Sequence, residues 1–178
     1  MTELSTTLVL GGARSGKSAF AERLVAESGL ARIYLATATA DDEEMKARIA
    51  HHRAQRGQGW TTIEEPLALV DALTREATQG RAVLVDCVTL WLSNLMLAAR
   101  DPEIEARRLA RFLGVARYPI VFVSNEVGLG LVPETPLGRR FRDAQGRLNQ
   151  IMAAAVPDVV FIAAGLPLWL KRSSIQEK

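Results

Sequence analysis

A glycine-rich segment near the amino terminus carries the clearest chemical signal in the sequence. Its residues, Gly-Gly-Ala-Arg-Ser-Gly-Lys-Ser, match the spacing G-x-x-x-x-G-K-[ST] between a strand-like and a helix-like stretch. In such a loop, glycines let backbone N–H groups turn inward around phosphate oxygens, and the next helix N-terminus adds partial positive charge. Lys17 would reach the β- and γ-phosphates, and the Ser18 hydroxyl would ligate Mg²⁺. We therefore predict a nucleoside triphosphate site at Gly11, Gly12, Ala13, Arg14, Ser15, Gly16, Lys17 and Ser18.

A second candidate is Asp86, which directly follows the apolar run 82–85. P-loop proteins place at such a strand end the carboxylate that holds Mg²⁺, either directly or through water. The alternative is that Asp86 only forms a turn or caps a helix. The predicted P-loop upstream favours the metal role.

Two adjacent histidines, His51 and His52, are the only histidines in the sequence, and they lie among Arg48, Arg53 and Arg56. Histidine can act as a nucleophile toward phosphorus, and this divides one displacement into two. Nearby guanidinium groups would favour the neutral imidazole and stabilise charge on a phosphate. The alternative is a solvated pair near a helix end that interacts with the last carbonyls. Spacing alone favours the solvated pair.

Two further stretches allow both a functional and a structural interpretation. Residues 125–134 follow an apolar run and contain two glycines and a proline, which suits either a substrate loop or a structural crossover. Downstream, four arginines could hold phosphate or form a solvated face: Arg139, Arg140, Arg142 and Arg147. The interleaved Asp143 favours the solvated face.

The elements that would position these residues alternate along the chain. Strands are predicted at residues 6–10, 32–37, 60–63 (a short edge strand), 82–86, 120–124 and, as the last one, 159–163. Helices are predicted at residues 19–27, 41–54, 66–80, 89–99, 103–116 and 137–155, followed by a frayed polar tail over 171–178. This alternation predicts an α/β fold with a mostly parallel open sheet and helices on both faces. Ligands of such sheets bind beyond the carboxyl ends of the strands. We therefore expect one crevice to be surrounded by residues 11–18, Thr37, Asp86, Asn125, Glu126 and Gly165.

Composition sets broader limits. The 178 residues fit a single domain over 1–178, with 48% hydrophobic and 24% charged residues. A net charge of +2 does not by itself predict nucleic-acid or membrane binding. The single cysteine, Cys87, excludes an intrachain disulfide, suits a reducing compartment and is expected to be a buried small hydrophobe. With no basic leader segment and no apolar run of membrane-spanning length, we expect a cytoplasmic, soluble protein.

Several blocks together resemble the bifunctional adenosylcobinamide kinase/adenosylcobinamide-phosphate guanylyltransferase family of cobalamin synthesis, and they occur in the family's order. They are far more specific together than the P-loop alone. The blocks are residues 11–18, 36–38, 42–45, 48–53, 85–89 with 94–95, 125–134 and 141–150. The resemblance implies a three-layer, RecA-like P-loop NTPase fold and a homotrimer in which the corrinoid lies between subunits.

The resemblance also implies two reactions. In the first, the aminopropanol hydroxyl of adenosylcobinamide takes the γ-phosphoryl group of ATP or GTP. In the second, GTP transfers GMP to that phosphate through a covalent guanylyl-histidine, releasing pyrophosphate. We assign the family's histidine to His52, with His51 as the alternative, which reverses the interpretation from spacing alone.

Guanine-nucleotide contacts beyond the P-loop are implied by the same resemblance. Some family members have Glu where this chain has Asp86. The implied contacts are Ala36, Thr37, Ala38, Arg53, Ala54, Gln55, Arg56, Glu64 and Asp86.

The two reactions demand different geometries. Phosphoryl transfer needs charge neutralisation at the γ-phosphate, whereas guanylyl transfer needs His52 near the α-phosphorus. We therefore predict that the helix over 41–54 moves or that the nucleotide binds in two registers. Two other functions stay open: a monofunctional small-molecule kinase with incidental histidines, and a RecA-like ATPase stimulated by nucleic acid. The low aromatic content, 6%, argues against the second.

Overall fold

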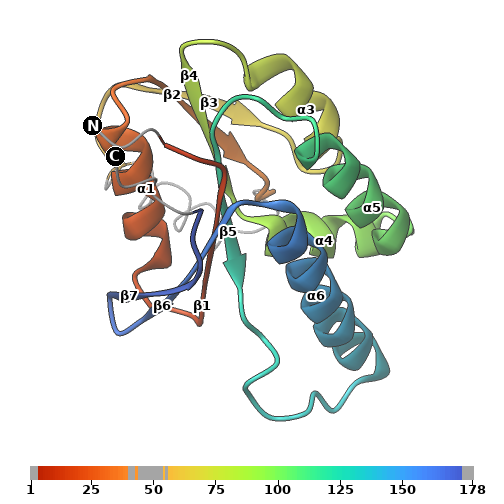
Figure 1. The fold of residues 1–178 in the computed structure, drawn as a ribbon. Helices are drawn as coiled ribbons and strands as arrows, with labels where there is room; N and C mark the ends of the chain where they lie inside the picture. The colour runs from red at the N-terminus through yellow and green to blue at the C-terminus, as the bar shows by residue number, and fades with distance from the viewer. Residues whose placement is uncertain (1–3, 40–42, 44–53, 55, 174–178) are drawn as a thin grey trace.

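Seven strands form one sheet in the order β3-β2-β4-β5-β1-β6-β7 (Figure 1). The computed structural model describes residues 4–39, 43, 54 and 56–173. Every neighbouring pair of strands is parallel except β6 and β7, so the mostly parallel open sheet is confirmed. The strands are β1 (Thr7–Gly11), β2 (Ala31–Ala36), β3 (Trp60–Glu64), β4 (Arg81–Asp86), β5 (Ile120–Asn125), β6 (Asp158–Ala163) and β7 (Leu166–Lys171).

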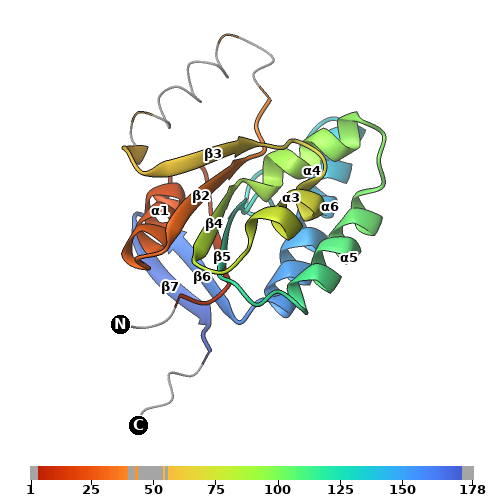
Figure 2. The same cartoon turned by 90° about the horizontal axis from the view of Figure 1, so that it is seen from above.

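Helices cover both faces of the sheet, but unequally. On one face lies α1 (Lys17–Glu27), and the opposite face carries α3 (Leu69–Glu76), α4 (Val88–Leu97), α5 (Pro102–Leu113) and α6 (Pro136–Ala155) (Figure 2). The strands supply both layers because their side chains alternate: Val83 and Val85 face the α3–α6 layer, whereas Ala82 and Leu84 face α1. All four of these side chains are fully buried.

Local sequence signals explain where the helices begin. Asp101 caps α5, since its Oδ1 accepts hydrogen bonds from the backbone of Glu103 (2.8 Å) and Ile104 (3.3 Å), with Pro102 in the first helical turn. The helix predicted over 66–80 is shorter in the structure, because Glu65 Oε1 accepts hydrogen bonds from the N–H groups of residues 67 and 68 and holds them in a turn. The helix predicted over 41–54 lies almost entirely outside the described residues.

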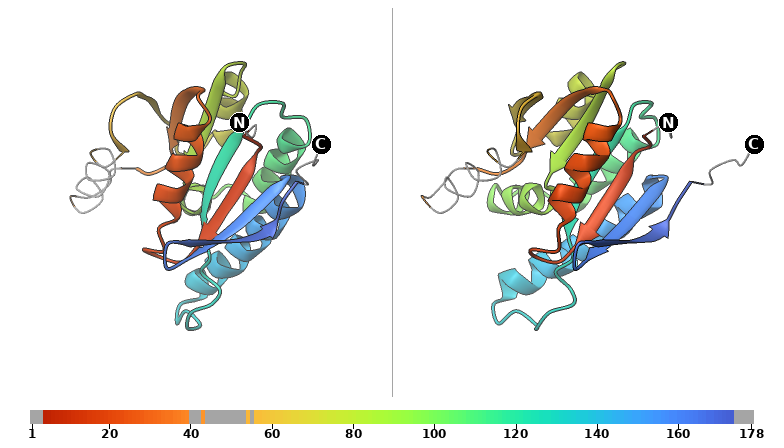
Figure 3. Two further views of the ribbon diagram at one scale, coloured as in Figure 1. Left: turned by 60° about the vertical axis from the view of Figure 1, so that its left-hand side comes forward. Right: turned by 90° about the vertical axis from the view of Figure 1, so that its left-hand side faces the viewer.

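Residues 159–163 form a strand as predicted, within β6, but the prediction that this strand is the last one is wrong. A two-residue turn, Ala164 and Gly165 with φ of 50° and 79°, reverses the chain into the antiparallel edge strand β7 (Figure 3). The sequence pattern of a buried strand is missing here, because Leu166, Leu168 and Leu170 are all more than half exposed. Trp169 alone points back to the α1 side, where its ring meets Phe20 edge-on at 6.3 Å between centroids.

The end of β7 is also tied to the other layer. Lys171 Nζ donates hydrogen bonds to the carbonyl oxygens of Ala153 (3.1 Å) and Val156 (2.6 Å), where α6 ends. A cation is favourable at this position because the last helical carbonyls carry partial negative charge. Residue 171 therefore belongs to the sheet and not to the polar tail predicted from the sequence.

Two expectations from composition can be compared with the fold. Cys87 is 6% exposed and lies in the core beneath α1, which confirms the buried small hydrophobe. Within the described part of the chain, no helix has the length and apolarity needed to cross a membrane.

Candidate active site

The carboxyl ends of the central strands open into one large cavity. It has a volume of about 1200 Å³, above the usual range for small-molecule sites. Its walls come from residues 13–19 and Glu22, from the β2 end, from β3, and from the ends of β4 and β5. The structure thus brings Lys17, Ser18, Asp86 and Asn125 to the same space, as the rule for open α/β sheets predicts.

The P-loop connects β1 to α1 in a tight, internally bonded turn. Lys17 is 9% exposed, and its Nζ donates a hydrogen bond to the carbonyl oxygen of Gly12 over 3.0 Å. Gly16 has a φ of 92°, which strains any larger residue, and a Cβ there would meet Gly165 Cα at a tight 3.3 Å, so both observations disfavour substitution. Gly165 therefore supports the loop from behind and does not line the cavity; its N–H donates to the carbonyl of Ser15 over 2.9 Å.

Asp86 is held by an aromatic hydroxyl at the cavity wall. Tyr34 donates from its OH to Asp86 Oδ2 over 3.1 Å. Burial, followed by the charge of Asp86, raises the pKa of Tyr34 well above its ordinary value, so the hydroxyl stays protonated and can donate. The sequence prediction did not include Tyr34, whose place in an apolar strand indicated only a core residue.

Arg56 stacks on the face of the same ring. Its guanidinium carbon lies 3.4 Å from the Tyr34 ring centroid, and its Nη2 donates to Thr62 Oγ1 over 3.2 Å. Arg56, Glu64, Ala36 and Ala38 all line the cavity, so the structure places these residues of the predicted nucleotide set around it.

Glu22 is a cavity residue that the sequence prediction missed. It lies on α1 one turn after Ser18, so the i,i+4 spacing was the available signal. Burial raises the pKa of the Glu22 carboxyl; the nearby charge of Asp86 raises it further, and Arg56 lowers it. Two carboxylates and one guanidinium therefore share this wall.

Thr37, which is predicted to contact nucleotide, uses its side chain for internal hydrogen bonds in this structure. Its side chain is fully buried and its Oγ1 donates to the Cys87 carbonyl (2.7 Å) while accepting from the Cys87 N–H (3.0 Å). Its own carbonyl accepts a hydrogen bond from Asn94 Nδ2 over 2.7 Å. Thr37 therefore fastens the end of β2 to the chain that follows β4, and it does not line the cavity.

The remaining predicted residues divide into three groups. Gly11 and Gly12 shape the loop without lining the cavity, and Ala54 is exposed. Of the 125–134 stretch, Asn125, Glu126 and Val127 line the cavity, whereas Leu129 and Leu131 are 82% and 96% exposed. The others lie outside the described residues: His51, His52, Arg53 and Gln55.

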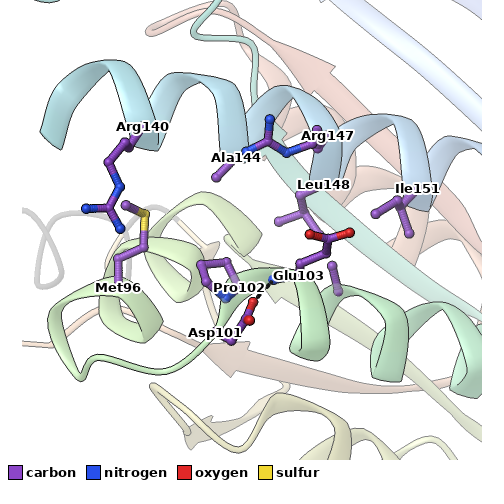
Figure 4. A pocket seen from close by; sticks show the side chains of 10 residues that line it. Met96, Asp101, Pro102, Glu103, Arg140, Ala144, Arg147, Leu148 and Ile151 are labelled. Atoms are coloured by element: carbon purple, nitrogen blue, oxygen red, sulfur yellow. Dashed lines mark hydrogen bonds between the residues drawn. The ribbon is translucent and has the colours of Figure 1, made fainter. Parts of the chain in front are cut away.

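None of the four arginines of α6 lines this cavity. Arg139 donates to the carbonyls of residues 133 and 134, and Arg142 lies 3.6 Å from Asp143. Arg140 and Arg147 line a separate groove of about 170 Å³ between α6 and the α4–α5 turn, facing Asp101 and Glu103 (Figure 4). The prediction of a solvated face is the one that fits these positions.

The donor set is suited to Mg²⁺ bound together with a nucleotide. The Ser18 hydroxyl and the Asp86 carboxylate border the same cavity, and Mg²⁺ is commonly held by one or two protein oxygens plus phosphates. Among the described residues, no group of three or more His, Cys, Asp or Glu side chains could hold a metal alone. Phosphate oxygens would therefore complete the coordination.

Comparison with known proteins adds the family. Residues 7–170 match the model of the family described as cobinamide kinase / cobinamide phosphate guanyltransferase. A bifunctional adenosylcobalamin biosynthesis protein of Pseudomonas aeruginosa, CobP, is 54% identical over 166 residues, covering 92% of this chain and 96% of the relative. The corresponding protein of Escherichia coli, CobU, is 38% identical over 179 residues, with 92% and 98% covered.

Solved structures with low sequence identity support the fold alone. The RadB recombinase aligns with a TM-score of 0.51 at 15% identity, covering 88% of this chain and 73% of RadB. An ATPase of a bacterial type III secretion system aligns with a TM-score of 0.56 at 13% identity, covering 93% and 56%. These neighbours confirm the RecA-like P-loop fold, and the match over residues 7–170 shows that the chain belongs to the family of bifunctional cobinamide kinases and cobinamide phosphate guanylyltransferases.

Proposed function

We propose that this chain phosphorylates adenosylcobinamide with ATP or GTP and then transfers GMP from GTP to the new phosphate through a histidine. The observation that carries this proposal is the single cavity that joins Lys17 and Ser18 to Asp86 and to Arg56. The first three suit the β- and γ-phosphates and their metal ion. Arg56 closely follows the tandem histidines in the sequence.

The kinase step needs positioning and charge neutralisation. The acceptor hydroxyl oxygen forms a bond to the γ-phosphorus as the bond to the β-phosphate oxygen breaks, and the hydroxyl proton leaves to a base or solvent. Lys17 and the inward N–H groups of the P-loop would stabilise the charge on the leaving diphosphate. A bound Mg²⁺, held by Ser18 Oγ and Asp86, would supply further charge neutralisation at the phosphates.

Tyr34 and Arg56 position the charged groups on the cavity wall that would border the nucleotide phosphates. The Tyr34 hydroxyl fixes one oxygen of Asp86, and the stacked Arg56 places a permanent positive charge beside Asp86 and Glu22. Together with Arg14 and Lys17, this charge favours an anionic ligand in a cavity whose walls also carry four carboxylates, those of Glu22, Glu64, Asp86 and Glu126. Three cationic side chains in one cavity support binding of nucleotide phosphates.

In the guanylyl step, an imidazole nitrogen of His52 attacks the α-phosphorus of GTP, and pyrophosphate leaves. An oxygen of adenosylcobinamide phosphate then attacks the same phosphorus and releases the histidine. Arg56, which follows His52 by four residues in the sequence, lines the cavity, and this supports the assignment. His51 is the alternative nucleophile.

Intact-protein mass spectrometry after incubation with GTP and Mg²⁺ tests the covalent step. We expect one added GMP on the wild type and on His51→Ala, and none on His52→Ala. The adduct should be acid-labile and alkali-stable, as a phosphoramidate is. An enzyme that phosphorylates cobinamide but never acquires the adduct would instead be a monofunctional kinase.

The oligomeric state and the cellular location form part of the same proposal. We propose one domain over residues 1–178, a homotrimer with the corrinoid between subunits, and a cytoplasmic location. The exposed apolar side chains at Leu129, Leu131 and Val132, next to the cavity-lining Glu126, support a subunit contact near the site. Light scattering after gel filtration measures the subunit number, and a monomer at micromolar concentration would contradict it.

A further inference from the structure

Three buried polar side chains form a hydrogen-bonded group between α6 and the end of β5. Gln145 and Asn149 lie one turn apart on α6, and Ser124 is the last but one residue of β5. Ser124 Oγ donates to Asn149 Oδ1 over 2.6 Å, and Gln145 Nε2 donates to the same oxygen over 2.9 Å. Gln145 Nε2 also lies 3.0 Å from Ser124 Oγ. Such a group in an apolar layer fixes one relative position of its elements, because any shift leaves buried polar atoms unpaired.

The group acts on the backbone of Asn125. Asn149 Nδ2 donates to the Asn125 carbonyl oxygen over 3.2 Å. On the other side, the Asn125 N–H donates to the hydroxyl of Thr89, on α4, over 2.8 Å. The next N–H, that of Glu126, donates to the carbonyl of Gly11 over 3.1 Å. Three different elements therefore hold the main chain at Asn125 and Glu126.

Asn125 also borders the nucleotide site. It lines the same cavity as Lys17, Ser18 and Asp86, and it pairs in register with Gly11, where the P-loop begins. In the part of the chain that the structure describes, its carboxamide has no hydrogen-bond partner, whereas its backbone groups are both engaged. An unused donor on a fixed backbone thus stands between the P-loop and Asp86.

We propose that Asn125 Nδ2 donates a hydrogen bond to an oxygen of the transferring phosphoryl group, and that Asn149 and Gln145 are its positioning residues. This inference rests on the proposed kinase function. A preorganised neutral donor stabilises charge that develops on the phosphoryl oxygens without reorganisation during the reaction. Removing such a donor costs a factor on the order of 10² in kcat.

The Asn125→Ala variant tests the contact. It keeps both backbone hydrogen bonds, so the fold should persist. We expect the kcat of phosphoryl transfer to cobinamide to fall on the order of 10²-fold, with the Kd of GDP, which lacks the γ-phosphate, changed less than twofold. A kcat within twofold of the wild type overturns the proposal. A wild type that is as inactive as Lys17→Ala would refute the kinase function itself.

A double-mutant cycle tests the positioning role. Asn149→Ala should lower kcat about tenfold, and Asn125→Ala/Asn149→Ala should be no slower than Asn125→Ala, because Asn149 acts only through Asn125. Multiplied effects would show a general structural role and overturn the positioning role. If Asn149→Ala does not fold, Asn149→Ser enters the same cycle. Gln150→Ala, an exposed amide on the same helix, is the matched control and should match the wild type.

Discussion

Replacement of Thr37 by valine is the sharpest test of how the site is supported. Valine has nearly the shape of threonine but lacks the hydroxyl that serves both the N–H and the C=O of Cys87. Thr37 is fully buried, so water cannot replace those hydrogen bonds. The Cys87 carbonyl keeps the hydrogen bond that it accepts from the Trp91 N–H over 3.2 Å, so only the Cys87 N–H is left unpaired. One unpaired backbone group costs about 1–3 kcal/mol, and with the lost hydrogen bond to the carbonyl we expect the free energy of unfolding to fall by roughly 2–3 kcal/mol.

The matched control is Thr37→Ser, which keeps the hydroxyl and loses one methyl group. It should cost about 1 kcal/mol through the small cavity that it leaves. Equilibrium unfolding in urea measures both variants, and the midpoint should shift far more for valine than for serine. The reasoning would be refuted if the two variants shifted the midpoint equally. It would also be refuted if the valine variant lay within roughly 0.5 kcal/mol of the wild type, which is the range of ordinary surface substitutions.

The same variant separates two roles for Thr37. If it only fastens β2 to the chain after β4, folded Thr37→Val protein should bind GDP with a Kd within about twofold of the wild type, since no contact to the ligand is lost. A Kd raised by an order of magnitude in fully folded protein would restore the nucleotide contact that the family resemblance implied.

Three further predictions concern the cavity and the sheet edge. Lys17→Ala should lower phosphoryl transfer by at least about 10³-fold, measured with saturating acceptor, because the P-loop loses its cation; retained activity would exclude this loop as the kinase site. The pKa of Tyr34 is higher in the folded protein than its ordinary value of 10.0. The contribution of Tyr34 to stability is therefore fully present below pH 10.0, and it is lost as the pH rises above that value toward the folded pKa. Tyr34→Phe should therefore lose less stability than the wild type between about pH 9.5 and 11.5 in urea titrations, and parallel losses would contradict the shift. Lys171→Met should lower stability by about 1–2 kcal/mol, since the α6 carbonyls lose their cation, and no change in the urea midpoint would show that water serves equally well.

Much of the sheet could be predicted because its strands are apolar on both faces. Residues 82–85 of β4 and 120–123 of β5 are all apolar, and the polar residues that follow these runs also located Asp86 and Asn125. The edge strand β7 escaped prediction because its leucines face solvent and it contains a proline. Strand identity at a sheet edge depends on hydrogen bonding to a neighbour, which periodicity does not encode.

The cavity shows a similar division. The P-loop was predictable because its glycines and lysine are needed at fixed spacing in one continuous segment. Tyr34 and Glu22 were not, because their importance depends on the packing of β2 and α1 around Asp86. Thr37 was assigned by resemblance at the correct place in the fold, but its hydroxyl is used for internal bonding that only the structure reveals.

The strand order has a consequence for how the protein is made. β1 leaves the ribosome well before its two neighbours in the sheet, β5 and β6. The phosphate-binding turn therefore cannot be completed until β6 has been translated. Ribosome-bound nascent chains that end before β6 should fail to retain nucleotide, so ligand affinity arises only once β6 is available rather than gradually.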